Sequence, residues 1–296
     1  MGFIKDGSNE STQQLVKVEL ENINAALTAL DVNISSDFML DVQRGLKTGI
    51  STFTVLGHSS TLNTGNTPET IWMKGGLYHN PNGLYGEPVH TGWIPAASTL
   101  SIKSTSVNDT SAGTGAQKIT VVGLDTNRLE ISETVIMNGT TDVVTSQLFL
   151  RVNMMFVPEN SVGSLETNDG DITLWETGTT LNVMSYLEAS HSYAQSAIWS
   201  VPSDETWYMI GIDGYLYDTT NAGNIAVVSF NEKRGGVFSK YLEFAVGTQG
   251  STAQVNVDDR FIMPSGSDWV MRAIEVSNNG AIATFNGVLL RVKNNI

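Results

Sequence analysis

The chain has 296 residues, of which 41% are hydrophobic and 16% are charged, so it has enough apolar material to bury a core. Its 30 acidic residues outnumber its 16 basic ones, giving a formal net charge of -14. No cluster of Lys and Arg is present, which argues against direct binding of nucleic acid. The absence of cysteine excludes disulfides, thiolate metal sites and a cysteine nucleophile.

The first residues, MGFIKDGSNESTQQ, lack the charged and then apolar pattern of a signal peptide. No apolar run in the chain approaches the roughly 18 residues that a membrane span needs. We therefore expect a protein that works in aqueous surroundings without a membrane anchor.

Residues 11–30 predict the one clear helix. Ser11 and Gln14 stand three apart, as in a capping box. Apolar residues follow at spacings of 4, 3, 4 and 3, the narrow seam of a coiled coil, over about two heptads. This helix either packs on its own chain, or forms a small bundle between identical subunits, or docks on a larger assembly. We assign residues 1–36 to this attachment segment, whose oligomer or attachment residues are Val16, Leu20, Ile23, Leu27 and Leu30.

Residues 37–95 are rich in Gly, Asn, Thr and Pro and contain turn sequences such as NPNG and YGEP. Their aromatic residues are scattered rather than periodic. Long irregular segments are uncommon inside a compact domain. We therefore predict an extended arm with short strands, which lies across a neighbour or a partner.

Two further regions show the period-2 alternation of β-strands. In residues 96–160, runs such as STLSIKSTSV and KITVVGL are separated by turn sequences, which predicts an antiparallel sandwich. Residues 191–296 hold seven strand candidates, which suggests a Greek-key or jelly-roll sandwich. Residues 161–190 are left as a connector. The predicted fold class is mainly β, with two antiparallel β-sandwich modules, Ig-like or jelly-roll-like, a short N-terminal helix and an extended arm.

The stretch VNDTSAGTGAQKITVVGLD, residues 107–125, has the composition of a phosphate-binding loop but not its pattern. A P-loop needs Gly directly before its Lys and a helix after it. Here Gln117 precedes Lys118 and a strand pattern follows. We predict a hairpin loop in which Gly113 and Gly115 have positive φ and Lys118 faces solvent.

No constellation in the sequence indicates an enzyme or a cofactor site. The four histidines form no HExxH motif, and no Gly-x-Ser-x-Gly elbow occurs. Asp169 and Asp171, and Asp258 and Asp259, are nearby acids that a polysaccharide hydrolase or a calcium ion could use. Solvated turn carboxylates are the simpler interpretation. We predict no catalytic, cofactor-binding or metal-binding residues and no cofactor.

Several of these stretches resemble virion structural proteins of tailed bacteriophages. The segment from TLSIKSTSV to NGTTDV, followed by FLRVNMMFV, resembles one module of such proteins, and SVPSDETWYMIGIDGYL with FIMPSGSDWVMRAIEVSNNG resembles a sandwich module seen in them. The resemblance implies a non-enzymatic structural protein on the particle exterior, a head decoration or short head-fibre protein, assembled in the bacterial host cytoplasm. The alternative is a tail, baseplate or fibre component that attaches the particle to a host receptor.

The implied partners are other virion proteins, of the capsid or the tail, and further copies of this chain. A homo-oligomer is expected, with a trimer favoured. In the receptor-binding alternative, Trp175, Trp199 or Trp269 would be exposed and would contact a host surface glycan. We expect no direct contact with nucleic acid or with a membrane.

Overall fold

The structure is a computed structural model that describes residues 50–58, 69–70, 93–159, 161–163, 167–180, 182–194, 198–217, 225–234, 237–247, 253–256, 261–276 and 282–294. This part of the chain consists of strands β1 to β17 and loops, and it contains no helix. It therefore has no helix that could cross a membrane. The prediction of a mainly β fold is confirmed. The predicted N-terminal helix, with its seam from Val16 to Leu30, lies outside the described residues.

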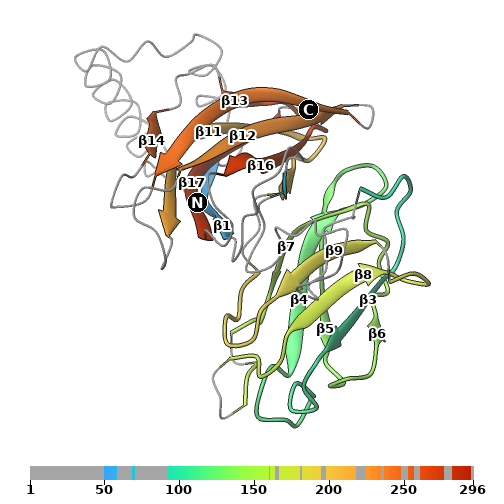
Figure 1. Ribbon diagram of the computed structural model, residues 1–296. Helices are drawn as coiled ribbons and strands as arrows, with labels where there is room; N and C mark the ends of the chain where they lie inside the picture. Colours follow the sequence, from blue (N-terminus) through green and yellow to red (C-terminus); the bar gives the residue numbers. More distant parts are fainter. Residues whose placement is uncertain are drawn as a thin grey trace, which may run out of the picture.

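Strands β3 to β9 form a central sandwich of two antiparallel sheets (Figure 1). The first sheet has the order β6 (Val143–Val144), β3 (Leu100–Ser104), β8 (Ile172–Glu176) and β9 (Val183–Leu187). The second has the order β5 (Glu130–Ile136), β4 (Lys118–Leu124) and β7 (Arg151–Phe156). Ile102 and Leu174 of the first sheet share one apolar core with Ile119, Val121 and Met155 of the second. Burial of this alternating apolar face, at about 25 cal/mol per Å², is what stabilises the sandwich.

Strands β8 and β9 lie in residues 161–190, which the sequence pattern left as a connector. Strand β8 pairs with β3 along five residues, and β9 pairs with β8. The central sandwich therefore extends to Leu187, and the predicted connector is wrong. All five residues of β9 are buried, because one face of the strand meets the sandwich core and the other meets the second sandwich. A strand buried on both faces shows no alternation of apolar and polar residues, so the period-2 criterion misses it.

The remaining strands form a second sandwich with nested pairing. Four antiparallel pairs are nested one inside the next along the chain. From the outermost to the innermost they are β1 with β17, β2 with β16, β11 with β14, and β12 with β13. This nesting of antiparallel pairs into two sheets is the topology of an eight-stranded jelly roll. One sheet contains β1 (Ile50–His58), β17 (Ile282–Lys293), β11 (Glu205–Tyr217) and β14 (Ala253–Asn256), with β15 (Ile262–Met263) also on β11. The other contains β10 (Ile198–Ser200), β16 (Asp268–Val276), β12 (Ile225–Arg234) and β13 (Val237–Gly247), with β2 (Glu69–Thr70) also on β16.

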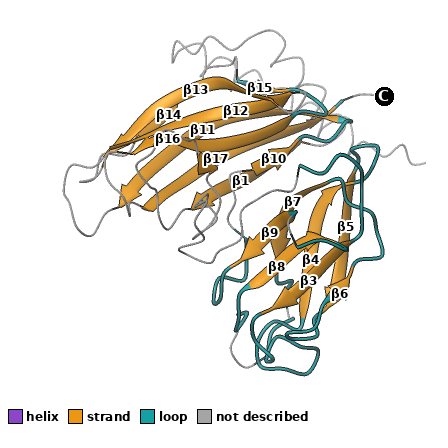
Figure 2. Ribbon diagram, turned by 45° about the vertical axis from the view of Figure 1, so that its right-hand side comes forward, coloured by secondary structure: helices purple, strands orange, loops and turns teal. Residues whose placement is uncertain are grey.

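The first two strands of this jelly roll come from the predicted arm, residues 37–95. Strand β1 pairs with β17 of its own chain from Ile50 opposite Val292 to His58 opposite Thr284. The central sandwich is consequently an insertion between the second and third strands of the jelly roll. In Figure 2 the two sandwiches form separate lobes. The sequence pattern of residues 191–296 found the other strands of the jelly roll, but not the two that precede the insertion.

Candidate functional site

The surface between the two sandwiches, here called the junction, gathers several buried and half-buried charged side chains. The central sandwich contributes the β4–β5 turn, residues 125–130, and the start of β7. The jelly roll contributes β10, the turn at residues 201–205, the start of β16 and the end of β17. Because these segments are far apart in the sequence, the junction exists only in the folded chain.

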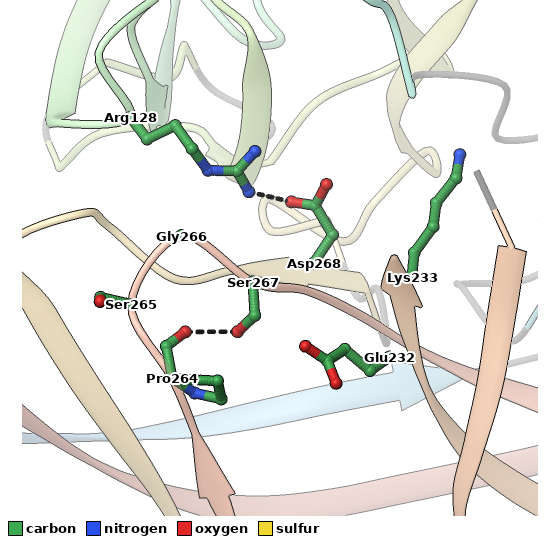
Figure 3. Close-up of a pocket in the computed structure, with 8 residues that line it drawn as sticks. All are labelled: Arg128, Glu232, Lys233, Pro264, Ser265, Gly266, Ser267 and Asp268. Atoms are coloured by element: carbon green, nitrogen blue, oxygen red, sulfur yellow. Dashed lines mark hydrogen bonds and ion pairs between the residues drawn. The ribbon is translucent and has the colours of Figure 1, made fainter. Parts of the chain in front are cut away.

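Asp268, the first residue of β16, is the centre of the junction, and its side chain is 8% exposed. Arg128 donates from Nη2 to its Oδ1 atom (Figure 3). Arg151 donates from Nε and Nη2 to its Oδ2 atom, at 3.1 and 3.0 Å. Ser200 adds a hydroxyl donor to Oδ1 at 2.7 Å. Both arginines belong to the central sandwich, so one carboxylate of the jelly roll binds the insertion through charge-assisted hydrogen bonds.

Arg128 reaches Asp268 from a left-handed backbone conformation, with φ of 60°. This conformation is uncommon for a residue with a long side chain. The jelly roll holds it in place, since the N–H of Ser203 donates to the carbonyl of Arg128 at 2.8 Å and the hydroxyl of Ser203 donates to the carbonyl of Asn127 at 2.9 Å. Within the turn, the Asp125 carboxylate accepts hydrogen bonds from the N–H groups of Asn127 and Leu129. The turn is therefore fixed from both sides.

In a second group of contacts across the junction, the cation belongs to the jelly roll and the anion to the central sandwich. Arg291 of β17 donates from Nη2 to Glu130 of the central sandwich at 2.7 Å. Arg291 also binds Glu205 of its own jelly roll through Nε and Nη2, both at 2.8 Å. Trp207 donates its indole N–H to Glu205 at 2.7 Å, and Lys293 lies 3.5 Å from the same carboxylate.

The environment of Glu205 shifts its acid strength. Burial by itself raises the pKa of Glu205, but hydrogen bonds from Arg291 and Trp207 and the charges of Arg291 and Lys293 outweigh burial. The pKa of Glu205 is therefore lower than its ordinary value of 4.5. The carboxylate stays ionised and keeps Arg291 in the position from which it contacts the central sandwich.

Neutral contacts complete the junction. The side-chain amide of Asn153 donates to the carbonyl of Ser200 at 2.9 Å and accepts from its N–H at 2.8 Å, as a neighbouring strand would. Tyr186 of β9 packs with Ile198 of β10 and Val270 of β16 in an apolar cluster that Trp93 borders. Contacts of this number and variety fix the angle between the two sandwiches.

The first part of the Gly-rich stretch, residues 107–117, is built around one buried carboxylate. Asp109 is fully buried. Its Oδ1 atom accepts from the N–H groups of Ala116 and Asp169 at 2.7 and 2.8 Å. Its Oδ2 atom accepts from the N–H of Gly170 at 2.9 Å and from the hydroxyl of Ser104. The loop therefore binds its own aspartate where a P-loop would bind a phosphate.

The predicted positive φ of Gly113 and Gly115 is wrong, because among the described glycines only Gly139, Gly178 and Gly266 have it. The two glycines are needed for space instead. A Cβ atom on Gly113 would lie 1.9 Å from the carbonyl oxygen of Asn108, and one on Gly115 would lie 2.1 Å from Oδ1 of Asp109. The prediction that Lys118 is exposed is confirmed.

The acidic pair Asp169 and Asp171 also holds loops together. Asp169 accepts hydrogen bonds from the Ser106 hydroxyl and from the Asn108 amide. Asp171 accepts from the N–H of Ala189 at 2.9 Å. Asp258 and Asp259 lie outside the described residues. Within the described ranges, no group of three or more His, Asp or Glu side chains could hold a metal ion.

The expectation that tryptophans are exposed for glycan binding is wrong at all three positions. Trp175 is 7% exposed, Trp199 is 3% exposed and Trp269 is fully buried. Trp199 and Trp269 lie opposite each other on β10 and β16. Each of these side chains serves packing, because a large aromatic ring on a strand of a sandwich contributes most when it is buried.

Comparison with known proteins gives little. No family model matches the chain, and no curated protein matches it. Among solved structures, one of infectious bursal disease virus, Gt strain, covers 82% of this chain and 72% of that chain at 8% identity, with a TM-score of 0.22. A VP2 subviral particle of infectious bursal disease virus covers 82% and 72% at 9% identity, with a TM-score of 0.20. Similarities this distant carry no argument about this protein.

Proposed function

We propose that this chain is a non-enzymatic structural subunit of a virus particle. The observation that carries the proposal is the jelly roll with nested strand pairing, into which a second sandwich is inserted and fixed by ion pairs between the two. Eight-stranded jelly rolls build viral capsid and lectin domains. A fold alone does not determine a function. A sandwich held at a fixed angle on a jelly roll is what a subunit needs if one part contacts its neighbours and the other projects from them.

In this proposal the jelly roll attaches the subunit to its neighbours and the central sandwich projects. The two ion pairs of the junction, in which each sandwich supplies one cation and one anion, support this division between an attached and a projecting part. Rotation of the central sandwich would separate Arg128 from Asp268 and Glu130 from Arg291 together. Such an arrangement resists the lateral forces that act on a projection from a particle.

The finer assignment is to the exterior of a tailed-phage head, as a decoration or short head-fibre protein that forms a homo-oligomer, with a trimer favoured. The resemblance of the central and C-terminal segments to tailed-phage virion proteins supports it. The tryptophans that the tail alternative would place against a host glycan are buried. Other virion proteins are the partners in this assignment, and the N-terminal segment with Leu20, Ile23 and Leu27 is the proposed oligomer contact.

Two experiments test the proposal. Immunogold electron microscopy with an antibody against the full chain should label the head surface of purified particles. Label on the tail tip would refute the head assignment, and absence of the protein from purified particles would refute the structural role. Mass photometry of the chain without residues 1–36 should show monomers where the full chain forms trimers. An unchanged oligomer would remove the N-terminal segment from the mechanism.

A further inference from the structure

Strand β5 of the central sandwich has an open outer edge. Its sheet has the order β5, β4 and β7, so β5 pairs with β4 on one side and with no described strand on the other. In Figure 2, β5 and β6 lie at the same edge of the sandwich. The sequence of β5, EISETVI, contains neither Pro nor Lys, and its pairing with β4 has no register shift. It therefore lacks the features that usually protect an edge strand from other strands.

The other three edges of the central sandwich are closed. Strand β6 is only two residues long, and all five residues of β9 are buried. The outer edge of β7 pairs with a segment of the chain that follows β9. There Ala194 donates its N–H to the carbonyl of Met155, and Val157 donates its N–H to the carbonyl of Ser192, both at 2.8 Å. Among the four edges, β5 alone is left open by the described part of the chain.

Half of the backbone groups of β5 point toward this open edge. Met137, which follows the strand, donates its N–H at 3.0 Å to the segment before β4, so the odd-numbered residues of β5 face β4. In an antiparallel pair the alternate residues point the other way. The N–H and C=O groups of Ser132, Thr134 and Ile136 therefore face outward. Within the described residues, one hydrogen bond reaches them, from the side-chain amide of Gln147 to the carbonyl of Ser132 at 2.7 Å.

The large hydrophobic side chains that are exposed in the described part of the chain gather around the same edge. Two of them flank or end β5, one belongs to β6, one follows the residue that binds the Ser132 carbonyl, and one lies beside the loop after β5. In this order they are Leu129 and Ile136, Val144, Leu148 and Val107. An exposed apolar patch of this kind marks an interaction site.

We propose that β5 pairs antiparallel with β5 of a second copy of this chain, about a twofold axis at Thr134. A row of outward N–H and C=O groups fits an extended strand, and a twofold axis lets the same strand supply it. The stretch from Thr134 to Ile136 has no charged side chain, so two copies of a chain of net charge -14 can meet there without repulsion between carboxylates.

The charges also select the register. Pairing centred on Glu133 would place two carboxylates opposite each other, which is unfavourable. With Thr134 opposite Thr134, Ser132 lies opposite Ile136 and Glu133 lies opposite an apolar residue, Val135. The Ser132 carbonyl has two lone pairs, so it can accept the new bond beside the one from Gln147. This contact is independent of the proposed virion role and of the N-terminal segment.

Disulfide cross-linking of the full chain tests the proposal, because the chain contains no cysteine of its own. In the proposed register the two Thr134 Cα atoms lie about 5.5 Å apart, within the range of a disulfide. Under mild oxidation, Thr134→Cys should give linked pairs of chains on a non-reducing gel. Lys118→Cys is the matched control, since it is exposed on β4 and its counterpart would lie roughly 14 Å away across the sheet. We expect Thr134→Cys to link roughly tenfold faster than this control.

Ile136→Lys added to Thr134→Cys should abolish the link, because a lysine on an edge strand opposes pairing with another strand. Ile136 is 57% exposed, so this change should leave the fold intact. Equal rates in Thr134→Cys and Lys118→Cys, or a link that survives Ile136→Lys, would overturn the proposal. So would a link to a different protein, and none between copies, when the oxidation is repeated in a lysate of the expressing cells.

Sedimentation velocity decides the question without a cysteine, should Thr134→Cys not fold. The mean mass of the unsubstituted chain should rise with concentration, and Ile136→Lys should reduce that rise. The same concentration dependence in both chains would overturn the proposal.

Discussion

Replacing Asp268 by Asn tests whether the junction is a fixed connection. The substitution keeps the shape of the side chain and removes its charge. Arg128 and Arg151 then lose the carboxylate that both of them bind, while their side chains remain only 21% and 13% exposed. Two cations would thus be left in a poorly hydrated place without their counter-charge.

The structure sets the size of the effect. Removing one partner of a buried ion pair typically costs about 3–5 kcal/mol, because the other charge remains buried without compensation. The introduced amide would still accept a hydrogen bond from one arginine, which favours the lower end of that range. Asp142→Asn is a matched control. Its carboxylate lies 3.8 Å from Lys103, with both side chains about half exposed, and surface pairs contribute about 0–1 kcal/mol.

Urea unfolding followed by tryptophan fluorescence measures the loss of stability. We expect Asp268→Asn to lower the unfolding midpoint and to separate the unfolding of the two sandwiches into two transitions. Small-angle X-ray scattering should show a broader distribution of distances between the sandwiches. If Asp268→Asn lost no more stability than Asp142→Asn and kept one transition, the junction would not be the buried connection that we infer.

Three further predictions concern Lys233, Glu205 and Gly115. The pKa of Lys233 is lowered to about 8 from its ordinary value of 10.5, so between these two pH values the folded chain binds fewer protons at this site than the unfolded chain. The free energy of unfolding should therefore rise with pH across this window. Lys233→Met should remove that rise when urea unfolding is measured as a function of pH. Because the pKa of Glu205 is lowered, its contribution to the free energy of unfolding is present above pH 4.5 and is lost as the pH falls through the lower pKa of the folded state. Glu205→Gln should therefore reduce the dependence of stability on pH in the acidic range. An unchanged dependence would contradict the pairing of Glu205 with Arg291. Gly115→Ala should lower stability by about 3 kcal/mol in thermal unfolding, because its Cβ atom would clash with the buried Asp109, whereas Gly178→Ala, with open space around it and φ of 89°, should cost only about 1–2 kcal/mol.

The sequence predicted those elements whose signal is local. The alternation in KITVVGL gives β4, and the seven strand candidates after residue 191 all contain strands of the jelly roll. The rejection of a phosphate loop at residues 107–125 also needed only the strand pattern after Lys118. The prediction failed for β9, which is buried on both faces. It also placed the run ISTFTVLGH in an arm that lies across a neighbour, whereas this run forms β1 and pairs with β17 of its own chain.

The junction could not be predicted, because nothing local indicates it. Arg128 and Asp268 are 140 residues apart, and each alone resembles an ordinary charged residue beside a turn. The same holds for the tryptophans, since a Trp on a strand is equally compatible with an exposed or a buried face. Their burial follows from which sheet covers them.

By itself, then, the sequence determined that this chain is a β protein without disulfides, with its strands separated by turn chemistry. Period-2 alternation and turn residues act over a few neighbouring positions, so they are visible in the sequence. Only the tertiary structure decided that Ile50 pairs with Val292, that one sandwich is inserted into the other, and that arginines of the first meet a carboxylate of the second. These contacts join distant parts of the chain, and they form because burying the apolar faces of the two sandwiches brings those parts together.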